Sequence, residues 1–241
     1  GAGVMKVLDL FSGIGGFSLG LERAGMKTVA FCEIEPYCRA VLKRHWPYVP
    51  CYEDVRTLTA ERLRADGISV DVICGGFPCQ DVSMAGNRLG LAGARSGLWA
   101  EYCRLIRELQ PLYVIVENVT GLLSLGMGTV LGDLAAFRYD AEWHCIPATA
   151  VGAPHIRDRV WIVAYPADQP SETSVESIQA GRLSRELGRV FGGMRFQRVD
   201  QPDVLRVDDG LSPRLDGNEA CGNAVVPQIP EIIGKAIMAL K

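Results

Sequence analysis

The chain has 241 residues, of which 48% are hydrophobic and 22% charged, and its formal net charge is -3. This length and composition are typical of a folded protein with one large domain or two small ones, and they exclude a disordered or collagen-like chain. No segment approaches the roughly 18 uncharged apolar residues of a membrane-spanning helix, and no basic segment with an apolar core opens the chain. We therefore expect a cytoplasmic protein that does not bind membranes.

The cysteines and the cationic residues narrow the function classes further. Eight cysteines are scattered without a C-x-x-C pair, and most lie in apolar runs, so we expect neither a metal site nor a disulfide framework. Most of the 25 cationic residues are arginine, whose planar head suits phosphate and base edges. The net charge alone does not decide whether the protein binds nucleic acid.

Predicted strands and helices alternate over the first two thirds of the chain. Apolar runs predict strands over 4–10, 28–32, 70–74, 112–116, 139–146 and 160–164, and helical spacing predicts helices over 17–24, 36–46 and 98–109. Such alternation favours right-handed crossovers and an α/β fold with a doubly wound, mostly parallel, Rossmann-like sheet. Ligands of such sheets bind at the carboxyl ends of the strands.

The composition divides the chain into three parts. We expect one α/β domain over residues 1–165, which would hold the catalytic and cofactor-binding residues. Over 166–221 the composition shifts to Arg, Asp, Gly, Ser and Gln with weak periodicity, which indicates a short second region. Residues 222–241 regain an apolar helical pattern, and we expect this segment to pack back on the first domain.

A glycine-rich turn follows the first predicted strand. The run Asp9-Leu-Phe-Ser-Gly-Ile-Gly-Gly16 lets the backbone turn sharply before a helix N-terminus, which is typical of a nucleotide-like ligand. The full dinucleotide fingerprint has a third glycine where Ser18 stands, so the turn alone is a weak signal. Glu33, after the second strand, could accept both ribose hydroxyls, and Asp54 could accept from an adenine amine. Together they favour an adenosyl ligand, and a tight turn with solvated acids is the alternative.

Cys79 differs from the other cysteines because it lies in a polar turn, Gly75-Gly-Phe-Pro-Cys-Gln80. A free thiol with a pKa of about 8.5 is only a few per cent thiolate at neutral pH, so a nucleophile needs a helix N-terminus or a nearby cation. Several arginines could supply that charge. Cys79 is therefore the candidate nucleophile, and a buried structural cysteine is the alternative.

Five motifs carry a resemblance to a known family. They are Asp9-Leu-Phe-Ser-Gly-Ile-Gly-Gly16, Gly76-Phe-Pro-Cys-Gln80, Glu117-Asn-Val119, Arg157-Asp-Arg159 and Gly222-Asn-Ala-Val-Val-Pro227. Their order and approximate spacing resemble those of the DNA cytosine carbon-5 methyltransferases, of a bacterial or phage type. The motifs span essentially the whole chain, and their joint occurrence is highly specific.

The resemblance implies methyl transfer from S-adenosyl-methionine to carbon 5 of cytosine in double-stranded DNA, which leaves S-adenosyl-homocysteine. Cys79 would add to carbon 6 of a cytosine that has left the stack, and Glu117 would protonate or hydrogen-bond N3. Arg159 would bind the cytosine carbonyl oxygen, and Arg157 would orient the acid and the thiolate. His155 stands where the family usually carries glutamine.

The other predicted site residues form two sets, and no metal ligand is among them. The predicted cofactor-binding residues are Phe11, Gly13, Gly15, Glu33, Ile34, Asp54, Val55, Pro78, Leu98, Asn223 and Val225. The predicted DNA-binding residues are Gln80, Ser83, Arg88, Arg95 and Asn118. The loop 80–97 is expected to act as a lid over the DNA, with an ordinary flexible loop as the alternative.

The resemblance also implies partners. Residues 166–221 would form the target-recognition region, which is short for this family. We expect a monomer that is paired with a restriction endonuclease or carried by a phage.

Four other functions compete with this interpretation. The same reaction on RNA is the strongest, because the motifs report the base and not the sugar. A nicotinamide-dependent dehydrogenase would explain the glycine turn and Glu33 but leaves Cys79 and Glu117 unassigned. A zinc deaminase needs P-C-x-x-C and H-x-E, and it is rejected because Val82 occupies the second cysteine position and neither His45 nor His144 begins an H-x-E triplet. A non-catalytic homologue is disfavoured because Cys79 and Glu117 are both present.

Overall fold

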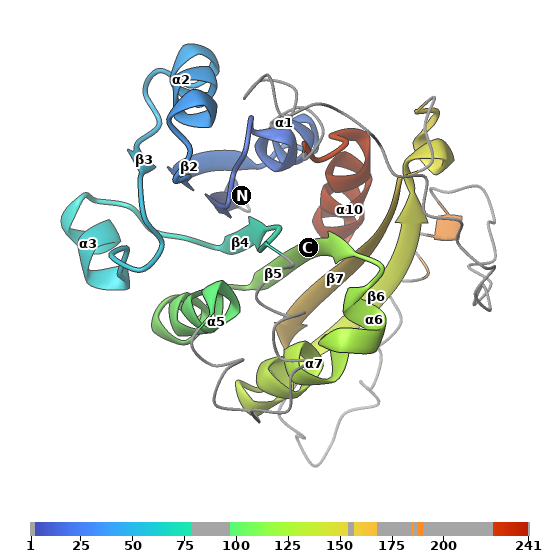
Figure 1. The fold of residues 1–241 in the computed structure, drawn as a ribbon. Coiled ribbons are helices and arrows are strands. Elements are labelled where there is room, and N and C mark those ends of the chain that lie inside the picture. The colour runs from blue at the N-terminus through green and yellow to red at the C-terminus, as the bar shows by residue number, and fades with distance from the viewer. Residues whose placement is uncertain are drawn as a thin grey trace, which may run out of the picture.

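The computed structural model describes residues 3–78, 97–153, 157–167, 185, 188–189 and 224–240. Its strands form one seven-stranded sheet in the order β3-β2-β1-β4-β5-β7-β6 (Figure 1). The strands are β1 (Lys6–Leu10), β2 (Lys27–Cys32), β3 (Cys51–Tyr52), β4 (Val72–Gly75), β5 (Tyr113–Val119), β6 (Tyr139–Pro147) and β7 (Asp158–Pro166). Only β7 runs antiparallel to its neighbours, β5 and β6. The predicted mostly parallel α/β sheet is confirmed.

Helices cover both faces of this sheet. They are α1 (Gly16–Arg23), α2 (Pro36–His45), α3 (Ala60–Ala65), α5 (Leu98–Leu109), α6 (Leu122–Leu125), α7 (Met127–Ala136), the short 3-10 helix η3 (Ala148–Val151) and α10 (Gln228–Ala239). Side chains of α1 and α10 pack on one face, and those of α3, α5, α6 and α7 pack on the other. In α5 the buried residues recur at helical spacing, which turns one apolar stripe toward the sheet. None of the helices in the described ranges is long and apolar enough to cross a membrane.

The C-terminal helix packs against α1, and two glycines permit the close approach. A Cβ atom on Gly20 would lie 2.2 Å from the carbonyl oxygen of Pro227. A Cβ atom on Gly16 would lie 2.3 Å from the carbonyl oxygen of Val225. Such distances are too short for any side chain beyond hydrogen. The segment before α10 therefore lies against the start of α1, next to the glycine turn.

β5 is longer than the apolar run that predicts it. The expected strand ends at residue 116, whereas β5 continues to Val119 because β7 pairs with its last residues. Glu117 and Asn118 therefore lie inside a strand, opposite Trp161 and Val160 of β7. This pairing fixes the backbone of the predicted acid more firmly than a turn after a strand would do.

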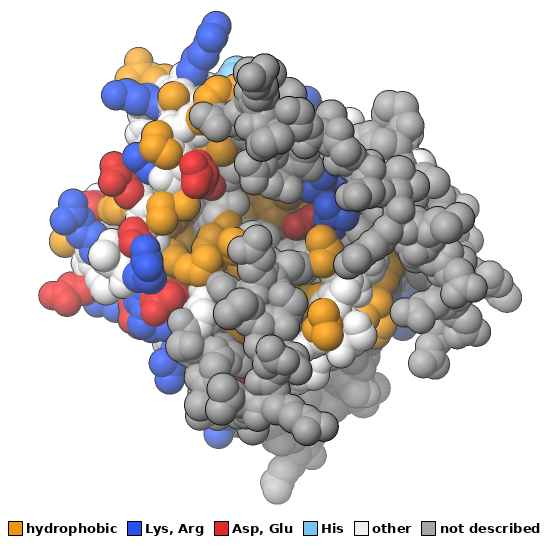
Figure 2. All heavy atoms as spheres, in the orientation of Figure 1, with side chains coloured by type: hydrophobic (Ala, Val, Ile, Leu, Met, Phe, Trp, Pro, Cys, Tyr) orange, Lys and Arg blue, Asp and Glu red, His pale blue; other side chains and the backbone are white. Residues whose placement is uncertain are grey.

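The described surface carries charges of both signs. Figure 2 shows lysine, arginine and acidic side chains intermixed around α2 and α3. Several of these charges form ion pairs, such as Arg62 with Asp66 at 3.0 Å and Arg56 with Asp54 at 2.7 Å. This part of the surface therefore produces no uniform basic field.

Candidate active site

The predicted site residues gather where the sheet reverses its winding. β1 lies between β2 and β4, so the connections after β1 and β4 leave toward opposite sides of the sheet. Open α/β sheets bind ligands in the crevice at such a point, outside the carboxyl ends of the strands. The glycine turn follows β1, Glu33 follows β2, and the segment 76–78 that precedes Cys79 follows β4. The glycine turn, Glu33 and the segment before Cys79 therefore meet at one edge of the sheet.

The glycine turn has left-handed backbone at three positions. The φ angles are 52° at Phe11, 53° at Gly13 and 89° at Gly15. Glycine takes this conformation without penalty, but a phenylalanine does so only where its surroundings hold it, and such residues cluster at ligand sites. The ring of Phe11 stacks on that of Tyr102 in α5, with 6.3 Å between the ring centroids. The half-buried Phe11 is thus held from the α5 side of the sheet.

Glu33 is fixed in an orientation suited to a nucleoside. Its side chain is buried, and its carboxylate accepts hydrogen bonds from the backbone N–H groups of Gly13, at 2.7 Å, and Glu35, at 2.8 Å. Arg39 donates to the carbonyl oxygen of Glu33 at 3.2 Å. Each carboxylate oxygen has a second lone pair, so both can also accept a ribose hydroxyl. The next residue, Ile34, is exposed.

Asp54 and Val55 lie in the loop between β3 and α3. The carboxylate of Asp54 accepts from the guanidinium of Arg56 at 2.7 Å, and this bond lowers the pKa of Asp54. An adenine amine would therefore share the carboxylate with Arg56. Val55 is 5% exposed and packs in the core cluster on the α5 face, and Leu98 at the start of α5 packs against the same cluster.

Glu117 forms the centre of the predicted catalytic group. Its side chain is buried, and Oε1 lies 3.0 Å from Nε of Arg159. The two residues are diagonal neighbours on paired strands, because Arg159 lies opposite Val119. On the other side, a Cβ atom on Gly76 would lie 2.7 Å from Oε2 of Glu117. The carboxyl group thus fits between an arginine and the backbone that leads to Cys79.

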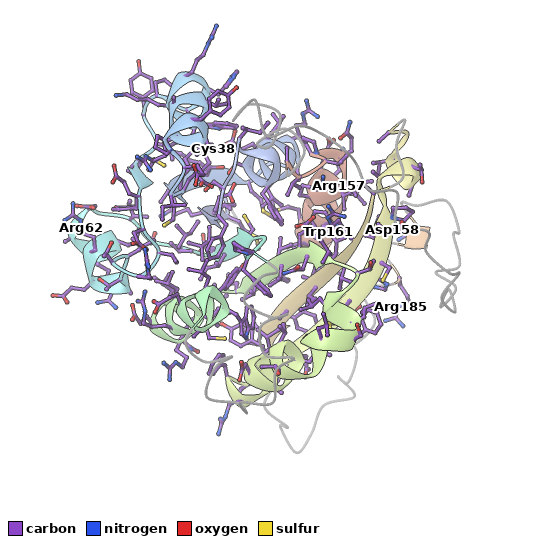
Figure 3. The ribbon with its side chains drawn as sticks, viewed as in Figure 1. Cys38, Arg62, Arg157, Asp158, Trp161 and Arg185 are labelled. Atoms are coloured by element: carbon purple, nitrogen blue, oxygen red, sulfur yellow. The ribbon has the colours of Figure 1, made fainter. Side chains whose placement is uncertain are left out.

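The electrostatics of Glu117 suit a proton donor. Desolvation by burial raises the pKa of Glu117, while the positive charges of Arg159 and Arg157 oppose this rise. Desolvation also lowers the pKa of the half-buried Arg157, and the charge of Arg159 acts in the same direction. Arg157 directly precedes β7, and Figure 3 labels it together with Trp161 of that strand. The structure therefore brings Glu117, Arg157 and Arg159 together, as the sequence predicts.

Asn118 has contacts that differ from the predicted contact with DNA. Its side chain is 3% exposed, and its Nδ2 donates to the carbonyl oxygen of Phe77 at 3.0 Å. Phe77 is buried too, with its ring 5.1 Å from that of Trp99, and Pro78 after it is exposed. In this way Asn118 anchors the segment before Cys79, and its contact with DNA stays a prediction.

Several predicted residues lie outside the described part of the chain. They are Cys79, Gln80, Ser83, Arg88, Arg95, His155 and Asn223. Of the last motif, Val225 is described and lies against Gly16 at the start of α1. The described residues contain no cluster of His, Cys, Asp or Glu that could hold a metal ion.

Asp9 begins the glycine motif but is not among the predicted site residues. Its side chain is fully buried, and Oδ2 accepts from the hydroxyl of Ser18 in α1 at 2.7 Å. Burial raises the pKa of Asp9 to about 7 from an ordinary value near 3.8. A polar residue inside the strand pattern that predicts β1 is the only sequence signal for this group.

We expect Asp9→Asn to stabilise the protein increasingly as the pH rises. A raised pKa means that the folded state keeps a proton that the unfolded chain releases, so the wild type loses stability between about pH 4 and pH 7. Asparagine is neutral throughout, and the gain at pH 8 should be on the order of 4 kcal/mol. Urea unfolding at pH 4, 6 and 8 measures it. Asp140→Asn on β6 is the exposed control, and an equal effect of Asp9→Asn at all three pH values would contradict this assignment.

Comparison with known proteins places the chain in a family. The model of the C-5 cytosine-specific DNA methylases matches residues 5–192. The Type II methyltransferase M2.BsuMI of Bacillus subtilis is 35% identical over 176 residues, which cover 70% of this chain and 44% of that protein. M.AquIA of Picosynechococcus is 31% identical over 66% of this chain and 71% of its own length. M.AgeI of Thalassovita gelatinovora is 35% identical over 88% of this chain and 51% of its own length.

Two solved structures are also similar to this chain. A prophage-encoded protein of Escherichia coli matches with a TM-score of 0.57 and 29% identity, over 67% of this chain and 47% of its own. Spodoptera frugiperda DNMT2 shares the fold at 23% identity with a TM-score of 0.57, over 71% of this chain and 54% of its own. The chain thus spans about half the length of four of these five proteins. The family model covers most of the chain, and the protein belongs to the C-5 cytosine-specific DNA methylase family.

Proposed function

We propose that this protein transfers a methyl group from S-adenosyl-methionine to carbon 5 of cytosine in double-stranded DNA. The observation that carries the proposal is the buried Glu117, which lies between Arg159 and the Gly76 backbone that leads to Cys79. This group stands at the same sheet edge as Glu33 and the glycine turn. Membership of the C-5 cytosine-specific DNA methylases supports both the base and the choice of DNA over RNA.

Carbon 5 of cytosine is not nucleophilic enough to attack a methyl group by itself. In the proposed reaction the Cys79 thiolate forms a bond to carbon 6, and the displaced electron pair moves into the ring toward N3. Glu117 gives its proton to N3, and the resulting enamine attacks the methyl carbon from carbon 5. N3 then returns its proton to Glu117. Transfer of the carbon 5 proton to a solvent water molecule expels the Cys79 thiolate and restores the ring. S-adenosyl-homocysteine is the other product.

The arginines beside Glu117 complete the chemistry. Addition of the thiolate places negative charge on the ring, and a guanidinium at the carbonyl oxygen stabilises that charge. Arg159 is assigned this contact, and Arg157 is assigned the orientation of the acid and the thiolate. Nε of Arg159 already binds Glu117. The Arg159 side chain would therefore hold Glu117 and the target cytosine in a fixed geometry relative to each other.

The methyl donor is assigned to the crevice around the glycine turn. Glu33 would accept the ribose hydroxyls, and its carboxylate is already oriented by two backbone N–H groups. Phe11, in a left-handed conformation, would line the adenine. Bound there, the donor supplies an electrophilic methyl group. The other residues assigned to this site are Gly13, Gly15, Ile34, Asp54, Val55, Pro78, Leu98, Asn223 and Val225.

We expect Glu33→Ala to weaken binding of S-adenosyl-homocysteine by about 1 to 3 kcal/mol, because the ribose hydroxyls lose a charged acceptor. Titration calorimetry measures the change. Glu35→Ala is the matched control, because its side chain is exposed and its backbone N–H remains available to Glu33. Equal affinity of wild type and Glu33→Ala would remove Glu33 from the site.

DNA binding requires that the target base leave the stack, because a duplex hides carbon 6 from attack. We assign the supporting DNA contacts to Gln80, Ser83, Arg88 and Arg95, in a loop that would close over the DNA. Residues 166–221 are assigned to target recognition. The Type II names of the relatives support a restriction-modification setting, in which the protein would act as a cytoplasmic monomer beside an endonuclease or within a phage.

Base-resolution sequencing of DNA after exposure to the protein and S-adenosyl-methionine tests this function. The expected result is methylcytosine at a defined short sequence. A parallel reaction on RNA of the same sequence separates the two substrates, and methylation confined to RNA would overturn the choice of DNA. Absence of methylcytosine in both would overturn the proposed activity.

A further inference from the structure

One face of α5 is tied to the loop that carries Asp54 and Val55. Arg104 is three residues after Glu101 and four before Glu108, so these side chains share that face of the helix. Its Nε lies 2.8 Å from Glu101, and its Nη1 lies 2.9 Å from Glu108. The side chain of Arg104 is 23% exposed, so solvent screens these pairs only in part. The two acids hold the guanidinium in one orientation.

The remaining nitrogen of Arg104 reaches across to the loop. Nη2 donates to the carbonyl oxygen of Val55 at 2.9 Å and to that of Leu58 at 2.8 Å. A guanidinium has five N–H donors in a rigid plane, and a lysine has a single compact head, so only arginine can join two acids and two carbonyl groups at once. The backbone on both sides of the turn at residues 55–58 is therefore fixed by one side chain.

Glu108 extends the connection to the next helix. While its Oε1 binds Arg104, its Oε2 accepts from the backbone N–H of Ala60, the first residue of α3, at 2.9 Å. This bond satisfies one of the donors that a helix N-terminus leaves without a partner. The loop between β3 and α3 is thus attached to α5 at Val55, Leu58 and Ala60.

The same helix supports the opposite side of the crevice. Tyr102, two residues before Arg104, stacks under Phe11, and its hydroxyl donates to the carbonyl oxygen of Ile115 in β5 at 3.1 Å. Phe11 and the loop that begins at Asp54 are the two places where the adenine is assigned. Helix α5 therefore supports both Phe11 and this loop, although neither is part of α5.

We propose that Arg104 is a positioning residue for recognition of the adenine base. By fixing the carbonyl groups of Val55 and Leu58, it holds the Asp54 carboxylate where it can accept from the 6-amino group. Without Arg104, the loop loses two hydrogen bonds, and Glu101 and Glu108 lose their shared partner. This inference rests on the proposed nucleoside site at Glu33 and concerns which base that site accepts.

The test compares two ligands by calorimetry: S-adenosyl-homocysteine and S-inosyl-homocysteine, in which oxygen replaces the 6-amino group. Wild type should prefer the adenosyl form by about tenfold, the ratio that corresponds to a hydrogen-bond difference of about 1.4 kcal/mol. Arg104→Ala should bind the adenosyl form about tenfold more weakly and lose most of this preference. Glu33→Ala should weaken both ligands by the same factor, because the ribose is common to them.

Two further variants make the outcome decisive. Arg107→Ala is the matched control on the same helix, because its guanidinium lies over the ring of Phe137, at 5.7 Å from the centroid. It should keep the wild-type preference. Arg104→Lys keeps a positive charge between Glu101 and Glu108 but not the planar fork, so it should fold and still lose preference, even if Arg104→Ala fails to fold.

A wild-type preference in Arg104→Lys would overturn the role of Arg104 while leaving the nucleoside site intact. A wild-type protein that binds both ligands equally would also overturn it, because there would be no adenine recognition to position. A wild-type protein that binds neither ligand would overturn the nucleoside site itself, and the inference with it.

Discussion

Cys79→Ala should abolish methyl transfer and leave binding of S-adenosyl-homocysteine unchanged. Without a thiolate there is no addition at carbon 6, and carbon 5 of cytosine stays too weak a nucleophile to attack. The measurement is transfer of a labelled methyl group to DNA. Cys145→Ala is the matched control, because Cys145 is an exposed cysteine on β6. It should keep wild-type activity.

A covalent trap separates the role of Cys79 from general damage. DNA that carries 5-fluorocytosine should form a complex with wild type that survives denaturation, because fluorine cannot leave carbon 5 as a proton does. The complex should be missing in Cys79→Ala and present in Cys145→Ala. Trapping that persists without Cys79 would move the nucleophile to another residue.

Glu117→Gln should lower kcat by about 10² to 10⁴, the range usual for a general acid. Glutamine has the size that the space beside Gly76 allows, and its carbonyl oxygen can still accept from Arg159. The fold and the affinity for S-adenosyl-homocysteine should therefore stay unchanged. Single-turnover methyl transfer measures the loss, and Glu61→Gln on the exposed side of α3 is the control. A kcat within about threefold of wild type would exclude Glu117 as the acid.

The pH dependence of methyl transfer by wild type and Glu117→Gln is a second test of the role of Glu117. Burial raises the pKa of Glu117, so a larger share of the carboxyl group carries a proton near neutral pH than in water. The wild-type rate should fall as the pH rises through this pKa, because the protonated form is lost. Glutamine does not titrate, and the variant should lack this limb of the pH profile.

The sequence determines the order of elements and most of the crevice. Strands and helices can be predicted from the sequence because the hydrophobic period is set within short windows of residues. Each of the six strands that the apolar runs predict is present in the structure. The glycine turn can be read for the same reason, since φ angles of 53° at Gly13 and 89° at Gly15 are local demands on the backbone. The sequence also predicts the place of Glu33 in the crevice, because Glu33 directly follows a predicted strand.

The tertiary structure decides how the catalytic group is assembled. β7 is the last strand in the chain, but in the sheet it lies antiparallel between β5 and β6. Only this position of β7 brings Arg159 to Glu117. The insertion also converts the expected turn at Glu117 and Asn118 into strand. No local pattern encodes such a choice, because pairing depends on the surface that all the other strands leave open.

Arg104 shows why part of a site has no sequence signal. Its partners across the loop are the carbonyl oxygens of Val55 and Leu58, and every residue type presents the same carbonyl. Gly76 is similar, because only the carboxyl group of Glu117 explains why a side chain is excluded there. The sequence thus determines which chemical groups are present and in what order. The fold decides which distant backbone atoms hold them, because those contacts depend on shape and not on residue type.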